Sequence, residues 1–149
     1  MGGQDIDNLL IKFIVDKFNE NRDEEAKLDL SDNPKALAKC RKLARSVKEL
    51  FASNVSEVDL TIDSLHDGDD LSDEEIKREE FDEICATLFS DALKPIEDAL
   101  LEAGLNKADI DEVVLVGGST RNLKIKEILS DFFDGKPLNK SANPDLVVA

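Results

Sequence analysis

The chain has 149 residues, 41% of them hydrophobic, and a formal net charge of −15 at pH 7. This length suits one compact domain or two small subdomains, and the hydrophobic content is sufficient for a core, so global disorder is not expected. The acidity argues against nucleic acid and anionic membrane surfaces as partners, because both attract basic patches. Any phosphate-bearing ligand must be held locally, against an unfavourable overall field.

Two cysteines, Cys40 and Cys85, lie among apolar residues of expected helices. We expect buried free thiols, as in a reducing compartment. The cytoplasm is the first expectation for localisation, with the endoplasmic reticulum and mitochondria as alternatives. No CxxC or Cys/His cluster suggests zinc. No signal-peptide pattern and no apolar run of membrane-spanning length is found, so no membrane partner is expected.

The first half of the chain contains two helical patterns. In the first, a stripe recurs at helical spacing: Leu9, Leu10, Phe13, Ile14, Lys17 and Phe18. A second helix is predicted from about Pro34 to Phe51, with Asp32 or Asn33 as N-cap. Its apolar face comprises Leu37, Cys40, Leu43, Ala44, Val47 and Leu50. Its other face carries a concentrated positive surface in this acidic chain: Lys39, Arg41, Lys42, Arg45 and Lys48.

A β-hairpin is predicted next. Apolar and polar residues alternate within 55–65, which is typical of a strand with one wet face. Asp67-Gly68 can turn the chain back. The acidic return segment, 69–75, is predicted as the second strand, and a helix start at 72–75 is the alternative.

The acids of this hairpin invite a calcium interpretation. The EF-hand spacing fails, because the required glycine is missing, so a solvated hairpin tip is favoured over a metal site. His66, the single histidine, has no nucleophile partner identifiable by motif and is expected to be an exposed loop residue. No catalytic arrangement stands out among so many acids.

Two further helices are predicted on either side of Pro95. The first starts at about Lys77 and carries an apolar side: Phe81, Ile84, Cys85, Leu88 and Phe89. Pro95 must break this pattern or start a new helix, which ends at Gly104.

The residues that follow form a candidate ligand site. Residues 113–116 are aliphatic and mostly β-branched, which predicts a strand buried on both faces. Gly117 and Gly118 come next, and without a Cβ they let a flat or charged group reach the backbone. A helix predicted over about 122–133 offers unpaired N–H donors at its start. Arg121 adds a planar cation that can stack on a ring or pair with phosphate. A plain strand–helix connection is the alternative.

This site lies in the sequence Asp111-Glu112-Val113-Val114-Leu115-Val116-Gly117-Gly118-Ser119-Thr120-Arg121. Further blocks are Gly2-Gly3-Gln4-Asp5-Ile6-Asp7-Asn8, Phe81-Asp82-Glu83-Ile84, Leu93-Lys94-Pro95, and the segments 131–136 and 138–145. Taken in order, these blocks resemble the seventy-kilodalton heat-shock (DnaK-type) chaperones over nearly the whole chain. One Gly-Gly pair is a weak signal, but this many blocks in order is a strong one.

The resemblance implies an α/β fragment of the actin-like ATPase fold, from the second lobe of the nucleotide-binding domain. Residues 1–85 resemble the outer subdomain, with helices and a small antiparallel sheet. Residues 86–149 resemble the C-terminal part of the inner subdomain, truncated. The first lobe and its phosphate loops are not found in this sequence. A helix start at 143–145 so near the last residue, and the abrupt Met1-Gly2-Gly3 start, lead us to expect a cut fragment.

The resemblance also implies site residues by position. The adenosine-binding turn would comprise Gly117, Gly118, Ser119 and Arg121. Arg121 would lie against the adenine face, and Asp145 resembles a polar residue of the same pocket. The helix around Lys48 resembles the facing wall, where a lysine bonds the ribose. No catalytic or metal-ligating residue is assigned.

That wall departs from the family pattern. Where the family has Glu, Lys, Arg and Ser on one helical face, this chain has Arg45, Lys48, Glu49 and Ala52. Only Lys48 matches, and one residue is inserted between this helix and the next strand. Asn122-Leu123 replaces the usual Ile-Pro, and Leu146-Val147 replaces Glu-Ala. The changes keep the fold and indicate altered adenine binding.

The resemblance implies a chaperone that couples ATP hydrolysis to the capture and release of unfolded polypeptide. Its ligand is ATP or ADP, with Mg²⁺ held by residues outside this sequence, and its partners include nucleotide-exchange factors and J-domain co-chaperones. This chain alone is expected not to hydrolyse ATP.

Two alternatives stay open. One is a protein-interaction module of a divergent, exchange-factor-type heat-shock relative with impaired nucleotide binding. The other is a different actin-fold ATPase, such as a sugar kinase.

Overall fold

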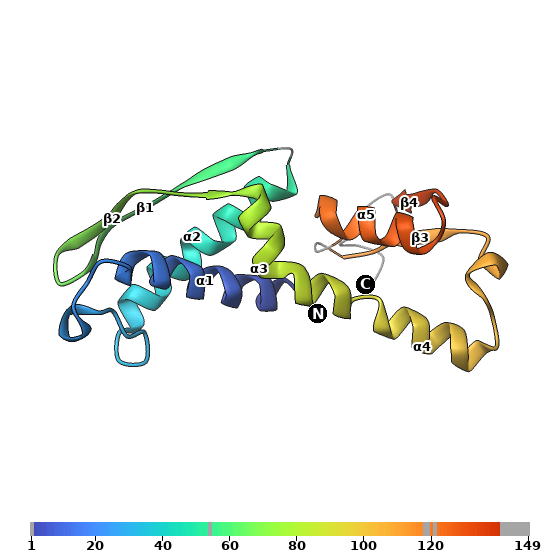
Figure 1. The fold of residues 1–149 in the computed structure, drawn as a ribbon, viewed down its shortest axis with the longest axis horizontal. Helices are drawn as coiled ribbons and strands as arrows, with labels where there is room; N and C mark the ends of the chain where they lie inside the picture. The colour runs from blue at the N-terminus through green and yellow to red at the C-terminus, as the bar shows by residue number, and fades with distance from the viewer. Residues whose placement is uncertain (1, 54, 118–119, 121, 141–149) are drawn as a thin grey trace. The chain divides into compact units, whose positions relative to one another are not determined.

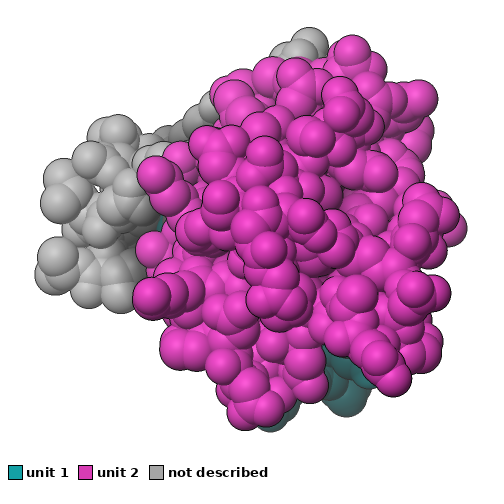
Figure 2. All heavy atoms as spheres, turned by 90° about the vertical axis from the view of Figure 1, so that its left-hand side faces the viewer, with its two compact units in different colours: residues 1–3, 86–149 teal, residues 4–85 magenta. Residues whose placement is uncertain are grey.

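A computed structural model describes residues 2–53, 55–117, 120 and 122–140 (Figure 1). Contacts divide the chain into two compact units, Gln4–Cys85 and Ala86–Ala149, the latter joined by residues 1–3 (Figure 2). We call them the 4–85 unit and the 86–149 unit. Their identity as outer and inner subdomains stays a prediction.

The 4–85 unit contains two long helices and a β-hairpin (Figure 1). Its elements are α1 (Gly3–Asn19), the 3₁₀ turn η1 (Glu24–Ala26), α2 (Pro34–Ala52), β1 (Glu57–His66), β2 (Asp69–Lys77) and the start of α3 (Arg78–Asp91). Its largest fully buried side chains are Ile6, Leu10, Ile14, Cys40, Val47, Phe51, Leu60, Ile76, Phe81 and Cys85. Both cysteines are buried and free, as predicted.

Helix α2 begins as predicted, with Asn33 as N-cap: its side chain accepts a hydrogen bond from the Ala36 N–H at 3.0 Å. The predicted apolar face is wrong at Leu50, which is 42% exposed, while Phe51 is fully buried. The buried stripe runs Ala36, Cys40, Ala44, Val47, Phe51. This stripe is rotated relative to the prediction because Phe51 stacks on Phe81, with ring centroids 4.8 Å apart.

The hairpin forms as predicted, and the alternative of a helix start at 72–75 is wrong. β1 and β2 pair antiparallel from Glu57↔Lys77 to His66↔Asp69, around a turn with positive φ at Asp67 and Gly68. Strand pairing wins because it places Leu71 and Ile76 in the core. β1 also lies against α2 (Figure 1).

His66 is not the exposed loop residue that was expected. It is the last residue of β1, and its side chain is 21% exposed. Its ring lies edge-on to Phe18 at 6.5 Å, and its Nδ1 is 3.4 Å from the Asn33 side-chain nitrogen. The turn folds His66 back against α1 and the α2 N-cap, which a local reading of the loop could not anticipate.

Arg78 ties the end of α2 to the start of the hairpin. Its guanidinium donates hydrogen bonds to the backbone carbonyls of Phe51, Ser53 and Val55 at 2.7–3.1 Å. It also lies 5.1 Å from the Phe51 ring centroid. The planar fork thereby satisfies carbonyls that a helix end leaves without intrahelical partners.

The 86–149 unit contains the remainder of α3 and smaller elements. They are α4 (Lys94–Ala103), the 3₁₀ turn η2 (Lys107–Asp109), β3 (Val113–Leu115), α5 (Leu123–Phe132) and β4 (Leu138–Lys140). Pro95 lies in the first turn of α4 and Gly104 ends it with φ +66°, as predicted. β3 pairs parallel with β4 from Val113↔Leu138.

The prediction of a strand buried on both faces is wrong for β3. Leu115 is buried, but Val114 is 52% exposed. Successive residues of a strand point to opposite faces, so β3 is covered on the face of Leu115 and open on the face of Val114.

Among the described residues, no helix has both the length and the apolar character needed to cross a membrane.

Candidate functional site

The predicted site residues are divided between the two units. Arg45 and Lys48 lie on α2 in the 4–85 unit, and Gly117 follows β3 in the 86–149 unit. The other predicted residues lie outside the described residues: Gly118, Ser119, Arg121 and Asp145. Each half is therefore described by itself.

Gly117 adopts a backbone conformation that favours glycine. Its φ is +90°, a value that residues with a Cβ rarely adopt, and among the described residues, its chain neighbours apart, no atom lies within 4 Å of where a Cβ would stand. Thr120 closes the turn, because its N–H and its hydroxyl both donate to the Gly117 carbonyl, at 3.1 and 2.7 Å. The open space above bare backbone fits a flat ligand group.

The start of α5 is not the phosphate cradle that an unpaired helix N-terminus would form. Asn122 is buried, and its side-chain oxygen accepts hydrogen bonds from the N–H groups of Lys124 and Ile125 at 2.8 and 3.4 Å. These are two of the donors that an anion would use. The expectation of unpaired donors is wrong here, because the chain supplies its own cap.

The α2 wall brings Arg45 and Lys48 together on one carboxylate. Lys48 Nζ donates to Asp7 Oδ1, and Arg45 Nε lies 3.9 Å from Asp7 Oδ2. The side chain of Asp7 is 8% exposed, against 26% for Lys48 and 61% for Arg45. Glu49 is exposed and Ala52 half-buried.

Asp7 was missed by reasoning from the sequence, although a signal was present. It occupies the buried face of α1, in phase with Leu10, Ile14 and Phe18. A carboxylate on an apolar stripe needs a cation partner, because burying an unpaired charge is costly. In the sequence, the basic face of α2 is the concentrated source of such cations.

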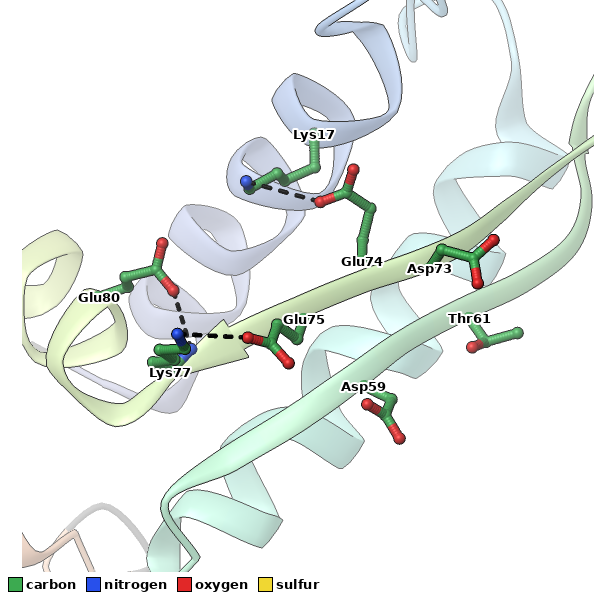
Figure 3. A pocket seen from close by; sticks show the side chains of 8 residues that line it. All are labelled: Lys17, Asp59, Thr61, Asp73, Glu74, Glu75, Lys77 and Glu80. Carbon is green, nitrogen blue, oxygen red and sulfur yellow. Dashed lines mark hydrogen bonds and ion pairs between the residues drawn. The ribbon is translucent and has the colours of Figure 1, made fainter.

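The hairpin, α1 and the start of α3 line an acidic hollow of about 740 Å³ (Figure 3). Its lining residues are Lys17, Asp59, Thr61, Asp73, Glu74, Glu75, Lys77 and Glu80. Lys17 lies 3.5 Å from Glu74, and Lys77 lies 3.4 Å from Glu75. Partial burial opposes the charged form of Lys17, but Glu20 and Glu74 outweigh it and raise its pKa. No three His, Cys, Asp or Glu side chains among the described residues form a group that could hold a metal ion.

The chain combines helices with small sheets, and its strand β3 leads into a glycine turn and a capped helix. This mixed fold is consistent with a fragment of an actin-like ATPase domain. The model of the family described as "Hsp70 protein" matches residues 1–149. The chain belongs to the Hsp70 family.

Relatives agree with this assignment. A ribosome-associated molecular chaperone of Saccharomyces cerevisiae is 43% identical over the whole chain, and a heat shock protein of Pyricularia oryzae is 44% identical. Heat shock cognate 70 kDa protein 3 of Dictyostelium discoideum is 41% identical. The chain spans 23% of the length of each of these proteins. It corresponds to a piece of the nucleotide-binding domain of this chaperone family.

Proposed function

We propose that this chain contributes the adenine and ribose side of the nucleotide cleft of a heat-shock chaperone. In the whole chaperone, ATP binding and hydrolysis would drive the capture and release of unfolded polypeptide. Gly117 to Arg121 would receive adenosine on one side, and Lys48 and Arg45 would form the other wall. Asp145 would belong to the same pocket.

The observation that carries this proposal is the pairing at the start of α5. Because Asn122 occupies the N–H groups of Lys124 and Ile125, the turn is poorly suited to phosphate. What it offers is open backbone at Gly117, which a flat base or sugar can approach. This favours the adenosine end of a nucleotide over its phosphates.

In this proposal the chain holds adenosine and not the magnesium ion. In the whole chaperone Mg²⁺ would neutralise charge on the phosphates, and the family resemblance implies that its ligands lie outside this sequence. The role of this chain is binding and orientation. Hydrolysis of ATP by the chain alone is not expected.

Calorimetric titration tests the proposal. ADP and adenosine should bind with similar, weak affinities, with Kd on the order of 1 mM. Pyrophosphate should not compete. Gly117→Val should abolish binding, because it places a β-branched residue at φ +90° in the ligand space.

Gly104→Val is the matched control, since Gly104 also has positive φ and open space around its Cβ position, but at the end of α4. It should leave binding unchanged. Full ADP affinity in Gly117→Val, displacement by pyrophosphate, or magnesium-dependent ATPase activity in the purified chain would each contradict the proposal.

A second candidate function is protein interaction, as in a divergent relative that acts as an exchange factor with impaired nucleotide binding. The altered wall at Arg45, Glu49 and Ala52 favours it. So does the acidic outer face of the hairpin (Figure 3). Nucleotide-exchange factors are the partners to test for an interaction module, and J-domain co-chaperones would be further partners of the whole protein.

Exchange-factor binding tests this second candidate. Asp69 and Asp70 are poor positions to change, because they bond Arg22 and the Ser64 N–H within the fold. Asp59→Asn, Asp63→Asn and Glu75→Gln instead remove charge from the exposed strand face. Captured exchange factor should fall several-fold, whereas Glu97→Gln with Glu102→Gln on α4 should change nothing. Undiminished capture excludes the hairpin.

A further inference from the structure

Asp7 is a buried acid near the N-terminal end of the apolar face of α1. It shares that face with Leu10, Ile14 and Phe18, each of them nearly fully buried. A carboxylate in such surroundings is retained only if nearby charges compensate it. Both compensating charges come from α2. Lys48 is 41 positions after Asp7 in the sequence.

The two cations would repel each other without Asp7. Arg45 and Lys48 are three residues apart on one face of α2, where like charges destabilise a helix. Asp7 divides its oxygens between them: Oδ1 accepts from Lys48, and Oδ2 lies 3.9 Å from Arg45. One carboxylate therefore holds two cations on the same wall.

The two cations are held unequally. Lys48 is directly hydrogen-bonded to Asp7 and 26% exposed, whereas Arg45 is at a longer distance and 61% exposed. Lys48 is thus the cation whose position the fold determines, and Arg45 is largely solvated. A lysine side chain otherwise loses much rotamer freedom when a ligand fixes it, and fixing it beforehand lowers that cost.

We infer that Asp7 is a positioning residue, which fixes the Lys48 ammonium for a ribose hydroxyl and so makes the wall selective for nucleosides over free bases. This rests on the proposed function, in which Lys48 meets the ribose. An ammonium carries three N–H donors, so a bond to Asp7 is compatible with a bond to a sugar oxygen. Adenine has no sugar, so its binding does not depend on this pair.

Titration of the chain with ADP and with adenine separates the inference from the proposed function. Lys48→Met should weaken ADP binding about tenfold, as expected for loss of a charged hydrogen bond. Asp7→Asn should weaken ADP binding by a similar factor, whereas Asp7→Glu, which keeps the carboxylate, should retain most of the ADP affinity. Neither should change the affinity for adenine. Lys42→Gln is the matched control, because it removes an exposed cation from α2 and keeps the Asp7–Lys48 pair, and it should leave ADP binding unchanged.

A double variant shows whether Asp7 acts through Lys48. If it does, adding Asp7→Asn to Lys48→Met causes no further loss of ADP affinity. A further loss, or equal losses for ADP and adenine, means a structural role and overturns the inference. If Lys48→Met matters and Asp7→Asn does not, the inference fails and the proposed function stands. If Lys48→Met leaves ADP binding intact, Lys48 does not bind the ribose, and both that part of the proposed function and the inference are overturned.

If Asp7→Asn does not fold, the unmodified chain still gives an answer by NMR of its lysine ammonium groups. A fixed Lys48 gives a slowly exchanging ammonium resonance before ligand is added, and that resonance shifts with ADP but not with adenine. A Lys48 resonance that exchanges as fast as those of exposed lysines overturns the inference.

Discussion

The 4–85 unit and the 86–149 unit differ in how completely they cover their own apolar residues. In the 4–85 unit, both long helices and both strands contribute fully or nearly fully buried side chains. In the 86–149 unit, α4 has no buried residue, Leu101 is 81% exposed and Val114 is 52% exposed. The first unit buries side chains from all of its long elements, whereas the buried side chains among the described residues of the second are confined to Phe89 of α3, β3 and the α5 segment from Asn122 to Phe133.

In both units a cationic side chain donates hydrogen bonds to several backbone carbonyls just before a strand. Before β1, the Arg78 guanidinium binds the carbonyls of Phe51, Ser53 and Val55. Before β3, the Lys136 ammonium binds the carbonyls of Lys107, Ala108 and Ile110. These hydrogen bonds are local, but their contribution to stability depends on the core behind them. We therefore expect similar changes to have unequal effects in the two units.

The largest expected effect is in the aromatic core of the 4–85 unit. Phe81→Ala removes the ring that stacks on Phe51 at 4.8 Å and leaves a cavity. It should lower the free energy of unfolding by about 3–5 kcal/mol, measured by urea denaturation followed by circular dichroism. Leu101→Ala on α4 is the matched apolar truncation in the other unit, and it should change stability by no more than about 0.5 kcal/mol. Equal losses would contradict the difference between the units.

The next largest effect concerns Arg78 and Lys136, the two cations that bind backbone carbonyls. Arg78→Met should lower the free energy of unfolding of the 4–85 unit by about 2 kcal/mol, because it leaves several carbonyls without a charged donor. Lys136→Met should cost about 1 kcal/mol, since an ammonium lacks the planar fork of a guanidinium and the unit behind it is less closed.

Native-state hydrogen exchange measures both effects in one sample, residue by residue. Arg78→Met should lower protection throughout the 4–85 unit, whereas Lys136→Met should lower it around β3 only. Arg78→Lys is the control, because it keeps the charge but not the fork, and it should recover only part of the loss. Protection that falls to the same extent across the chain in both variants would contradict two independently stable units.

Much of the fold was predictable because its signals are local. Asn33 before Pro34, Asp67-Gly68 in the hairpin turn and Gly104 after α4 each specify a boundary by their own backbone chemistry. Burial was less predictable, because it depends on partners remote in sequence. Leu50 was expected on the buried face of α2 but is 42% exposed, while Phe51 is fully buried. Val114 is 52% exposed although it lies in an aliphatic run.

The candidate site shows the same limit. Helical spacing alone placed Arg45 and Lys48 on one face, and the structure agrees. It could not reveal that Asp7, on a different helix, holds both of them. Nor could it show that the Asn122 side chain accepts hydrogen bonds from the first N–H groups of α5, since asparagine also occurs in loops. The roles of the predicted adenosine-turn residues stay predictions.

The smallest effect appears only at high pH and reports on the 4–85 unit alone, because both cysteines lie in it. Burial raises the pKa of Cys40 from 9.0 to about 11 and, with Asp82 nearby, that of Cys85 to about 12. The unfolded chain therefore releases these protons first. Their contribution to stability is complete below pH 9, and it is lost as the pH rises through about 11 and 12. Between pH 6 and 8 stability should not depend on the thiols.

The chain with both Cys40→Ala and Cys85→Ala isolates this effect, because lysines and other groups titrate equally in both proteins. Urea denaturation from pH 8 to 10.5 should show the unsubstituted chain losing stability more steeply above pH 9 than the variant. Alkylation by iodoacetamide at pH 8 should require unfolding of the 4–85 unit, and Phe81→Ala should speed it by the factor by which it raises the unfolded population. Fast alkylation of the unsubstituted chain would mean that this unit opens without unfolding, and would remove the contrast between the two units.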